Sequence, residues 1–481
     1  MSTAIPTNAA PFTTAEVVSA TKGTLVRGDG ARKHVGATTD SRAVAKGSIF
    51  VALRGEKFDG HTFVDGAVKN GVGLVVVEAG KGAEVAKGPD VVEVGDTLVA
   101  WGDLANAHFS RWKSHGGKIV AITGSAGKTT TKELCAALLE RVAEGHATRG
   151  NLNNRVGVPA VVLGLEEKHA FAVLEMGMSE PGEIARLTQI APPDVSIVTN
   201  VGLAHAGGVG GKREDVAREK GAIFEATGEN GTIVVNADDS FVVEQAKRSR
   251  AKSVTFGRAE NATYRLIARD SLGAKGSRLD LERPAGSLAF DFPFVGEGPA
   301  IDFVAALAAA EAVSGATISN ADVVAALAAV ALPSGRASVV TLADGTIVID
   351  DSYNANPDSM RAAIASLAEI AEREGKRAVA VVGEMRELGT GADAAHDEIG
   401  DELAAKKIAL VIGCGGLADR TLARAEAKGV AVKRAEDAQS AAKIAVSETG
   451  PGDVVLVKAS RGVAAEVVVQ ALQQARGGKG A

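Results

Sequence analysis

The sequence predicts an α/β protein with three domains. Its 481 residues are more than a single hydrophobic core usually organises. From Lys118 onward, short apolar runs alternate with amphipathic stretches, the pattern of βαβ units around a mostly parallel sheet. A Pro-Ser-Gly turn at residues 333–335 interrupts this alternation. We therefore expect a small α/β domain over residues 1–114, a central parallel-sheet domain over 115–332 and a C-terminal doubly wound, Rossmann-like domain over 333–481.

The composition limits the surroundings in which the chain can work. The net charge is −6 with acidic and basic residues interspersed, so no electrostatic surface for nucleic acid is expected. Cys135 and Cys414 have no metal-ligating neighbours at short spacing, which favours a reducing compartment. The first residues carry no basic and apolar leader, and apolar segments such as 303–310 fall short of the ~20 residues that span a bilayer. The sequence thus predicts a soluble, cytoplasmic protein without a membrane span.

The first domain is expected to open with a helix and continue in short strands. Thr13 to Glu16 reads Thr-x-x-Glu, a capping box that marks the start of a helix. SIFVALRG at 48–55 and VGLVVVEAG at 72–80 are apolar runs bounded by turn residues. Gly, Asp and Lys punctuate this region densely, as is typical of a small α/β domain.

The second and third domains are expected to repeat one unit, a buried strand followed by a helix. Amphipathic stretches such as 360–374 separate the strands. The strands expected in the second domain are 118–123, 170–176, 195–200, 231–236 and 252–256, and those in the third are 346–351, 377–383, 408–413 and 453–458.

The stretch GKIVAITGSAGKTTTKELCAALL predicts a phosphate-binding site. A strand ends at Thr123, a glycine loop follows, and a helix with apolar residues at Leu134, Leu138 and Val142 starts at Lys128. In this geometry the loop N–H groups and the helix N-terminus face an anion, and the lysine adds a point charge. An ordinary glycine-rich turn is the alternative, since Ile122 stands where the general pattern begins with glycine. The residues expected to contact a nucleotide phosphate or its Mg²⁺ are Gly124, Ser125, Ala126, Gly127, Lys128, Thr129 and Thr130.

Two polar side chains follow neighbouring strands of the predicted central sheet. Glu175 ends the strand AFAVLEM, and His205 follows the strand VSIVTN. Ligands bind at the carboxyl ends of parallel strands, so both residues should face the phosphate loop. Taken singly, the carboxylate is also explained as a helix cap or an ion-pair partner, and the histidine carries a similarly weak signal. Together beside a phosphate loop, they suit Mg²⁺ ions that carry phosphates.

Several motifs in a fixed order make the chain resemble the Mur ligases. They are TGSAGKTTTKE, EMGMSEPGEI, NVGLAH followed by EKGAIF, SGRASVV and DDSYNANPDSM. NLNNRVGVP and VVGEMRELG followed by His396 are most similar to members that join D-alanyl-D-alanine to UDP-N-acetylmuramoyl-tripeptide. The resemblance covers nearly the whole chain. It implies a monomeric ATP- and Mg²⁺-dependent ligase that works through an acyl phosphate in peptidoglycan synthesis.

The resemblance also assigns residues to the nucleotide. Arg336 is implied as a cation that reaches the γ-phosphate when the domains close; a solvated linker residue is the alternative, which the family context disfavours. Asp351 is similar to the family's ribose or nucleotide contact, and Asn354 and Asn356 to its adenine-side contacts. An Asx-turn and the cap of a helix starting near Asp358 explain the two asparagines equally well.

Other residues are assigned to the substrates by the same resemblance. TTDSRAVAKGSIFVALRGEKFDGH is similar to the family's uridine-nucleotide-binding region, so Ser41 and Arg42 are implied as contacts to the nucleotide end. Asn151, Asn153 and Asn154 are expected on the muramoyl-peptide side. VKASRG, in which Ala459 stands where the family has Gly, implies that Ser460 and Arg461 contact the dipeptide. Glu384 and His396 belong to a C-terminal signature without an assigned role.

Lys220 has two interpretations. The spacing of EDVAREKGAIFEA predicts a surface lysine on an amphipathic helix. The resemblance instead implies a lysine that CO₂ carbamylates, which turns an ammonium into an anionic oxygen ligand. On this second interpretation Lys128, Lys220, His205 and Arg336 are the catalytic residues, and Thr129, Glu175, His205 and Lys220 hold Mg²⁺.

Three alternative functions remain for comparison. A sister ligase that adds a single diamino acid normally carries an Asp-Asn-Pro-Arg signature, which this sequence lacks. Folylpolyglutamate synthases share the phosphate loop but lack the N-terminal uridine-binding region. An ATP-binding protein with a degenerate site would have lost Lys128 or Glu175, and both are present.

Overall fold

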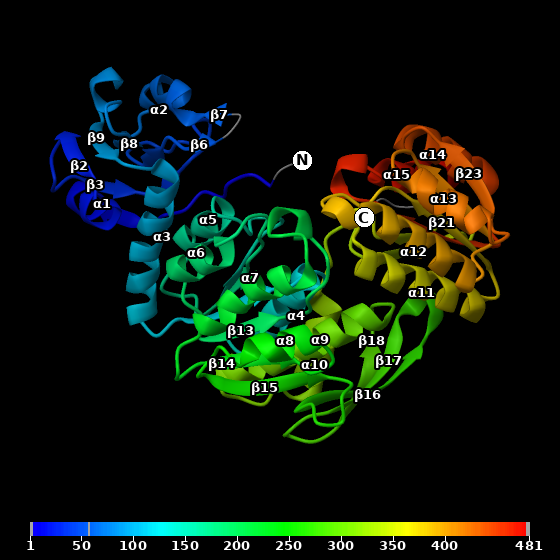
Figure 1. Ribbon diagram of the computed structural model, residues 1–481. Helices are drawn as coiled ribbons and strands as arrows, with labels where there is room; N and C mark the ends of the chain where they lie inside the picture. Colours follow the sequence, from blue (N-terminus) through cyan, green and yellow to red (C-terminus); the bar gives the residue numbers. More distant parts are fainter. Residues whose placement is uncertain (1–2, 56–57, 478–481) are drawn as a thin grey trace.

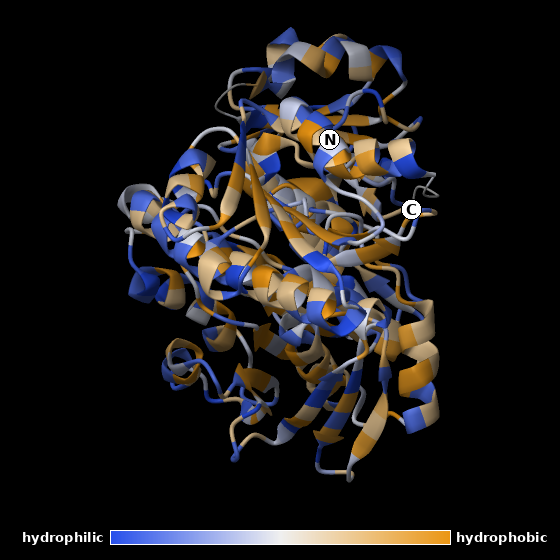
Figure 2. Ribbon diagram, turned by 90° about the vertical axis from the view of Figure 1, so that its right-hand side faces the viewer, coloured by the Kyte–Doolittle hydropathy of each residue, from blue (hydrophilic) through white to orange (hydrophobic). Residues whose placement is uncertain are grey.

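The computed structural model describes residues 3–55 and 58–477, which form three lobes (Figure 1). The first and third lobes lie apart, each against the central lobe. Residues 1–2 and 478–481, at the outer ends of the first and third predicted domains, and residues 56–57 of the predicted uridine-binding region lie outside the described residues. Figure 2 shows apolar strands in the interior and helices in which apolar and polar residues alternate along the chain. Among the described residues, no helix combines the length and apolarity that crossing a membrane requires.

The first lobe is a small α/β unit, as predicted. The capping box is present, since the Thr13 side chain accepts from Glu16 N–H and the Glu16 carboxylate accepts from Thr13 N–H. Its main sheet within the described residues is parallel except at β2. In spatial order the strands are β2 (Thr24–Arg27), β9 (Asp90–Val94), β8 (Leu74–Glu78), β5 (Ile49–Val51) and β4 (Ala37–Thr38); α1 (Thr14–Thr21), α2 (Val64–Lys69), β1 (Pro11–Thr13), β3 (Lys33–Val35), β6 (Arg54–Gly55) and β7 (Phe58–Asp59) complete the lobe.

Helix α3 (Thr97–Ser114) joins the first lobe to the second through a shared core. Buried Trp101, Leu104 and Phe109 belong to one apolar cluster that runs from the first sheet to the helices of the central lobe. The Trp101 indole N–H donates to the backbone carbonyl of Val156 at 2.9 Å. Since no solvent layer separates the two lobes along α3, they are packed as one body.

The described part of the central lobe builds a nine-stranded sheet. All five predicted strands are present and parallel, which confirms the predicted parallel-sheet core. The sequence analysis missed the antiparallel strands β17 and β18, whose residues alternate between buried and exposed. In spatial order the strands are β11 (Gly145–Ala147), β12 (Phe171–Glu175), β10 (Lys118–Thr123), β13 (Val195–Val198), β14 (Thr232–Asn236), β15 (Lys252–Gly257), β16 (Tyr264–Ser271), β17 (Ser277–Glu282) and β18 (Leu288–Phe292).

Helices cover both faces of the central sheet. Neighbouring residues of β10 show why, since Ile119 and Ala121 face one apolar cluster while Val120 and Ile122 face the other. One prediction about α4 is wrong: the helix ends at Glu140, so Val142 lies beyond it and is 44% exposed. One face carries α4 (Lys128–Glu140), α9 (Glu297–Ser314) and α10 (Asn320–Ala329), and the other carries α5 (Gly157–Leu163), α6 (Glu183–Ile190), α7 (Arg213–Glu225) and α8 (Ser240–Ala246).

The third lobe is doubly wound, as predicted. Its described residues form a six-stranded sheet, parallel except for β19, with α11 to α13 on one face and α14 and α15 on the other. In spatial order the strands are β19 (Ser338–Thr341), β20 (Ile347–Asp350), β24 (Asp453–Lys458), β21 (Arg377–Val382), β22 (Leu410–Cys414) and β23 (Ala431–Ala435); the helices are α11 (Pro357–Glu374), α12 (Ala392–Ala405), α13 (Ala418–Glu426), α14 (Ala438–Glu448) and α15 (Glu466–Arg476).

Candidate active site

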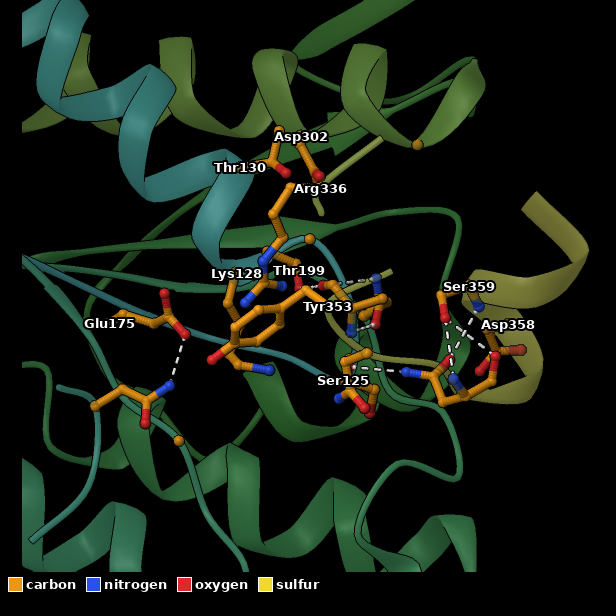
Figure 3. A pocket seen from close by; sticks show the side chains of 18 of the residues that line it. Ser125, Lys128, Thr130, Glu175, Thr199, Asp302, Arg336, Tyr353, Asp358 and Ser359 are labelled. Carbon is orange, nitrogen blue, oxygen red and sulfur yellow. Dashed lines mark hydrogen bonds between the residues drawn. The ribbon is translucent and has the colours of Figure 1, made fainter. Parts of the chain in front are cut away.

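A cavity of about 820 Å³ lies between the central and third lobes, at the carboxyl ends of β10, β12 and β13. Its volume is in the range of pockets that hold nucleotides and other small molecules. Figure 3 shows side chains from both lobes around this space, with Lys128 and Glu175 from the central lobe and Arg336 and Tyr353 from the third. The predicted residues His205 and Lys220 also line it. The structure thus brings together named residues that are up to 225 positions apart, from Lys128 to Tyr353.

The phosphate loop connects β10 to α4 and needs glycine at two positions. Gly124 has φ +156°, and a Cβ built there would lie 1.8 Å from Thr199 Oγ1. Gly127, immediately before α4, has φ +80°, and its Cβ would lie 2.1 Å from a carboxylate oxygen of Asp302. No larger residue fits at either place. The loop therefore lies at the N-terminus of α4, where backbone N–H groups and the helix dipole attract anions.

The end of β13 holds the phosphate loop in place. The side-chain oxygen of Asn200 accepts from Ala126 N–H at 2.9 Å, and its backbone carbonyl accepts from Ser125 N–H at 3.0 Å. The Thr199 hydroxyl donates to the Ala126 carbonyl at 2.6 Å. Sequence reasoning gave these two residues no role, because the strand pattern shows where they lie but not what they contact. Their hydrogen bonds fix the loop before any ligand arrives.

Glu175 lines the cavity and contacts Thr129, which lies behind the lining. The Thr129 hydroxyl donates to one carboxylate oxygen of Glu175 at 2.9 Å, and the Asn153 amide donates to the other at 2.7 Å. Both Thr129 and Glu175 are almost fully buried. Hydroxyl and carboxylate oxygens are the ligands that Mg²⁺ prefers, and this ion keeps several waters and phosphate oxygens besides. The residues present therefore fit the ion, although no group of three or more His, Cys, Asp and Glu side chains that could hold a metal is found among the described residues.

Two lysines converge on one carbonyl of the loop. The backbone oxygen of Gly124 accepts from Lys128 Nζ at 2.7 Å and from Lys220 Nζ at 3.1 Å. Burial lowers the pKa of Lys128, and burial together with the nearby Lys128 charge lowers that of Lys220 well below its usual value. The interpretation of Lys220 as a surface lysine is wrong, because the residue is 1% exposed and lies on the inner face of α7.

His205 lies at the cavity wall and contacts the third lobe. Its backbone is left-handed, with φ +61°, and its imidazole pairs with the carboxylate of Glu387, whose own φ is +64°. The hydrogen bond from His205 lowers the pKa of Glu387. Sequence reasoning missed Glu387, although it belongs to the VVGEMRELG motif. The predicted His396 supports the same segment from inside, since its buried ring accepts from Met385 N–H at 3.0 Å.

The segment that carries Arg336 is tied to the end of β20. Gly335 N–H donates to Asp350 at 3.0 Å, and Ala337 N–H donates to Asp351 at 3.2 Å. The Arg336 guanidinium carbon lies 4.1 Å from the centre of the Tyr353 ring. Burial raises the pKa of Asp351 even though Lys458 pairs with it. Asp351 and Arg336 both line the cavity, but the carboxylate already has a cationic partner.

The two asparagines predicted to lie near adenine differ in their surroundings. Asn356 caps α11, since its side-chain oxygen accepts from Ser359 N–H at 2.9 Å. Its amide N–H donates to the Ser125 carbonyl at 3.3 Å, so Asn356 links the third lobe to the phosphate loop. The helix cap considered from the sequence is thus confirmed. Asn354 is exposed and lines the cavity, and its backbone carbonyl accepts from Lys458.

A second cavity, of about 540 Å³, lies between the first and central lobes. Ser41 and Arg42 line it, and so do the stacked rings of Phe58 and Phe63, which sequence reasoning did not single out. Arg42 is exposed and pairs with Asp40 at 2.7 Å. The residues that line both cavities are Asn151, Asn154 and Val156. A molecule long enough to pass these residues reaches from one cavity to the other.

Ser460 and Arg461 do not line either of these cavities. The buried Ser460 hydroxyl accepts from Arg386 N–H at 2.9 Å and donates to the Ala355 carbonyl at 3.3 Å. Arg461 is partly exposed, pairs with Glu466 at 3.0 Å and lies 5.4 Å from the centre of the Tyr353 ring. The hydroxyl of Ser460 therefore links the segments of Arg386 and Ala355 within the third lobe. Arg461 keeps an exposed guanidinium beside the first cavity.

Asp302 is a cavity residue that sequence reasoning missed. It lies on α9 against Gly127, and burial raises its pKa from 3.8 to about 8. Between about pH 4 and pH 8 the folded protein holds a proton there that the unfolded chain releases, so the protein loses stability as the pH rises through this window.

Replacing Asp302 with asparagine should therefore raise the melting temperature by a few degrees at pH 8 and change it little near pH 4, because the neutral amide has no proton to lose. Thermal melts across this range check the prediction, with the exposed Asp65→Asn as the control. A melting curve with the same pH dependence as the unaltered protein would contradict it.

Comparisons with known proteins agree with this geometry. The family model described as Mur ligase family, catalytic domain, matches residues 35–108, the Mur ligase middle domain matches 122–310, and the Mur ligase glutamate ligase domain matches 335–461. The UDP-N-acetylmuramoyl-tripeptide–D-alanyl-D-alanine ligase of Escherichia coli is 35% identical over 443 residues, which cover 91% of this chain and 93% of the relative.

Solved structures give the same result. A crystal structure of MurF from Acinetobacter baumannii is similar with a TM-score of 0.84 and 30% identity, over 97% of this chain and 100% of the other. MurF ligase from Thermotoga maritima, solved in complex with ADP, gives a TM-score of 0.79 and 30% identity, over 91% and 97% of the two chains. The matched family models together extend into all three lobes and include the phosphate loop and Arg336. The chain belongs to the Mur ligase family.

Proposed function

We propose that this protein joins D-alanyl-D-alanine to UDP-N-acetylmuramoyl-tripeptide and converts ATP to ADP and phosphate. The observation that carries the proposal is the wall that the two cavities share at Asn151, Asn154 and Val156. A long substrate can place its nucleotide end beside Ser41 and Arg42 and its peptide end beside the phosphate loop. The Escherichia coli relative that is named for this activity is 35% identical over 443 residues, which cover 91% of the chain.

The reaction needs the carboxylate to be activated first. A carboxylate oxygen of the tripeptide attacks the γ-phosphorus of ATP, ADP leaves, and an acyl phosphate forms. The amine of D-alanyl-D-alanine then attacks the acyl carbon and loses a proton, and phosphate departs from the tetrahedral intermediate. Phosphoryl transfer is accelerated mainly by positioning and by neutralising charge. Lys128 at the start of α4 and Arg336 from the third lobe are placed to supply the positive charge.

Mg²⁺ would add to this neutralisation of the phosphate charge. We propose Thr129 and Glu175 as its protein ligands, with His205 and a carbamylated Lys220 at a second position. The low pKa of Lys220 favours the neutral amine that reacts with CO₂, and the reaction forms an N–C bond and releases one proton. Closure of the third lobe would shield the acyl phosphate from water. A cytoplasmic location and a monomeric state remain predictions.

Phosphate release from ATP tests the function directly. The protein is incubated with ATP, Mg²⁺ and UDP-N-acetylmuramoyl-tripeptide, and D-alanyl-D-alanine, a diamino acid or glutamate is added in parallel reactions. D-alanyl-D-alanine alone should stimulate phosphate release, and the product mass should equal that of the pentapeptide nucleotide. Stimulation by the diamino acid or by glutamate instead would identify one of the two related ligase activities. Phosphate release that none of the three acceptors stimulates would indicate an ATP-binding protein without ligase activity.

Replacing Arg336 with alanine should lower kcat by about 10²- to 10³-fold, the range measured when one charge-stabilising donor is removed. The KM for the UDP substrate should stay nearly unchanged, because Ser41 and Arg42 bind its nucleotide end in a different lobe. Steady-state kinetics check this result, with Arg278→Ala on β17 as the control. Equal losses in kcat and in affinity for the UDP substrate would place Arg336 at another step.

A further inference from the structure

The Arg336 guanidinium lies at the cavity, and the carboxylate near enough to interact with its charge, Asp351, is already paired with Lys458. The guanidinium makes no hydrogen bond or ion pair with any residue that the structure describes. The positive charge of Arg336 also lowers the pKa of Lys128, so the two cations lie near each other. Two like charges repel each other, and an anion that binds between them relieves this repulsion. Some other contact has to keep the guanidinium aimed at the cavity.

The ring of Tyr353 is that contact. Figure 3 shows Tyr353 next to Arg336 at the cavity, and the Arg336 guanidinium carbon lies 4.1 Å from the ring centre. The backbone that carries the ring is fixed, because Tyr353 N–H donates to the Gly335 carbonyl at 3.1 Å. Gly335 has φ +77°, and a Cβ there would approach the Tyr353 backbone nitrogen to 2.9 Å. The backbone segments that carry the arginine and the aromatic ring are therefore joined by one hydrogen bond.

An aromatic ring suits this task better than a carboxylate would. A carboxylate binds two guanidinium N–H groups and neutralises the charge, so the arginine would lose donors that a phosphate needs. A ring face attracts the cation through its quadrupole and leaves all five N–H donors free. An arginine side chain without any such contact would spend most of its time in other rotamers. The ring thus orients the charge while it keeps the donors available.

The same ring also approaches a second arginine. The Arg461 guanidinium carbon lies 5.4 Å from the ring centre, within the distance at which cation–π attraction acts. Arg461 belongs to the segment proposed for the dipeptide, whereas Arg336 belongs to the segment proposed for the γ-phosphate. The Tyr353 ring therefore lies close to the arginine proposed for the γ-phosphate and also to the arginine proposed for the dipeptide. Arg461 is also held by its ion pair with Glu466, so loss of the ring should leave Arg461 in place and free Arg336 alone.

We propose that Tyr353 is a positioning residue, whose ring holds the Arg336 guanidinium in the orientation that receives the transferring phosphoryl group. This inference rests on the proposed function and adds to it a residue that acts only through the arginine. The hydroxyl of Tyr353 makes no hydrogen bond with the described residues, so the ring face alone should matter. Phenylalanine should consequently replace tyrosine, and leucine, which has no π face, should not.

A double-mutant cycle tests the proposal. Tyr353→Leu should lower kcat about tenfold and leave the KM for the UDP substrate within about twofold, whereas Tyr353→Phe should stay within about twofold of the unaltered protein in both. Adding Tyr353→Leu to Arg336→Ala should lower kcat no further, since the ring acts through the arginine. Losses that multiply in the double variant, or a Tyr353→Leu variant with unaltered kcat, would overturn the proposal.

A binding measurement separates this proposal from the proposed function. Isothermal titration with ADP and inorganic vanadate, a mimic of the transferring phosphoryl group, does not depend on the acceptor. Tyr353→Leu and Arg336→Ala should each weaken the vanadate-dependent gain in affinity, and neither should change the affinity for ADP alone. If these shifts occur while D-alanyl-D-alanine fails to stimulate turnover, the proposed function is wrong and the role of Tyr353 stands. Unchanged vanadate binding in Tyr353→Leu would overturn the role itself.

Discussion

Replacing Lys128 with alanine should abolish ATP-dependent ligation while the protein stays folded. The lysine opens α4 at the phosphate loop, and its amine donates only to the Gly124 carbonyl among the described residues. Removing it takes away the positive charge nearest to the helix N-terminus, where the β- and γ-phosphates are expected. Burial disfavours the charged amine in the free protein, so its removal should cost little free energy of unfolding.

Two measurements check the Lys128 prediction. Phosphate release should fall to the background rate, and the melting temperature without ATP should change by no more than about 2 °C. Lys247→Ala, an exposed lysine paired with Glu244 in the same lobe, is the matched control and should keep full activity. The prediction fails if the melting temperature of Lys128→Ala drops strongly while ATP binding is retained, because the lysine would then serve the fold.

Lys220→Ala should remove nearly all activity, and small carboxylates should restore part of it. The residue is buried behind the phosphate loop, and its amine is 3.1 Å from the Gly124 carbonyl. If the amine carries a carbamate, alanine removes an anionic oxygen ligand and leaves a space of matching size. Acetate or formate can enter that space and supply a carboxylate.

The controls for Lys220 separate loss of a ligand from loss of packing. Lys220→Met fills the same volume without an oxygen, so it should be inactive and should not respond to acetate. Mass spectrometry and ¹³CO₂ labelling of the unaltered protein should detect the carbamate directly. Near-normal turnover of Lys220→Ala in CO₂-depleted buffer would exclude a catalytic role for the modification.

The local pattern of the phosphate loop was enough to predict its position. Strand β10, two glycines and Lys128 at the start of α4 occupy the predicted residues, because each depends on neighbours in the sequence. The burial of Lys220 was not predictable from spacing. Helix α7 packs against a sheet on one side and the phosphate loop on another, so a polar residue on its inner face looks exposed by periodicity.

Contacts between lobes were also beyond the reach of the pattern. Glu387 meets His205 and Asn356 meets Ser125 across more than 180 residues of sequence. The hydrogen bonds of the Ser460 hydroxyl to Arg386 and Ala355, within the third lobe, were likewise not predictable, and the contact of Ser460 to the dipeptide stays a prediction. Strands β17 and β18 show the alternation of buried and exposed residues that is typical of a half-buried antiparallel sheet. This alternation differs from the continuous apolar runs by which the parallel strands were predicted.

The core that runs along α3 has a consequence for modularity. Trp101, Leu104 and Phe109 fill the space between the first sheet and the central helices, so a fragment that starts at residue 115 would expose the apolar faces of α5 and α6 to water. Residues 335–477 instead carry apolar clusters on both faces of their own sheet. We therefore expect two independently folding units, one that comprises the first and central lobes and one that comprises the third lobe, with a domain boundary near Gly335. Chimeras of two relatives that are joined near Gly335 should fold, and chimeras that are joined after Ser114 should not.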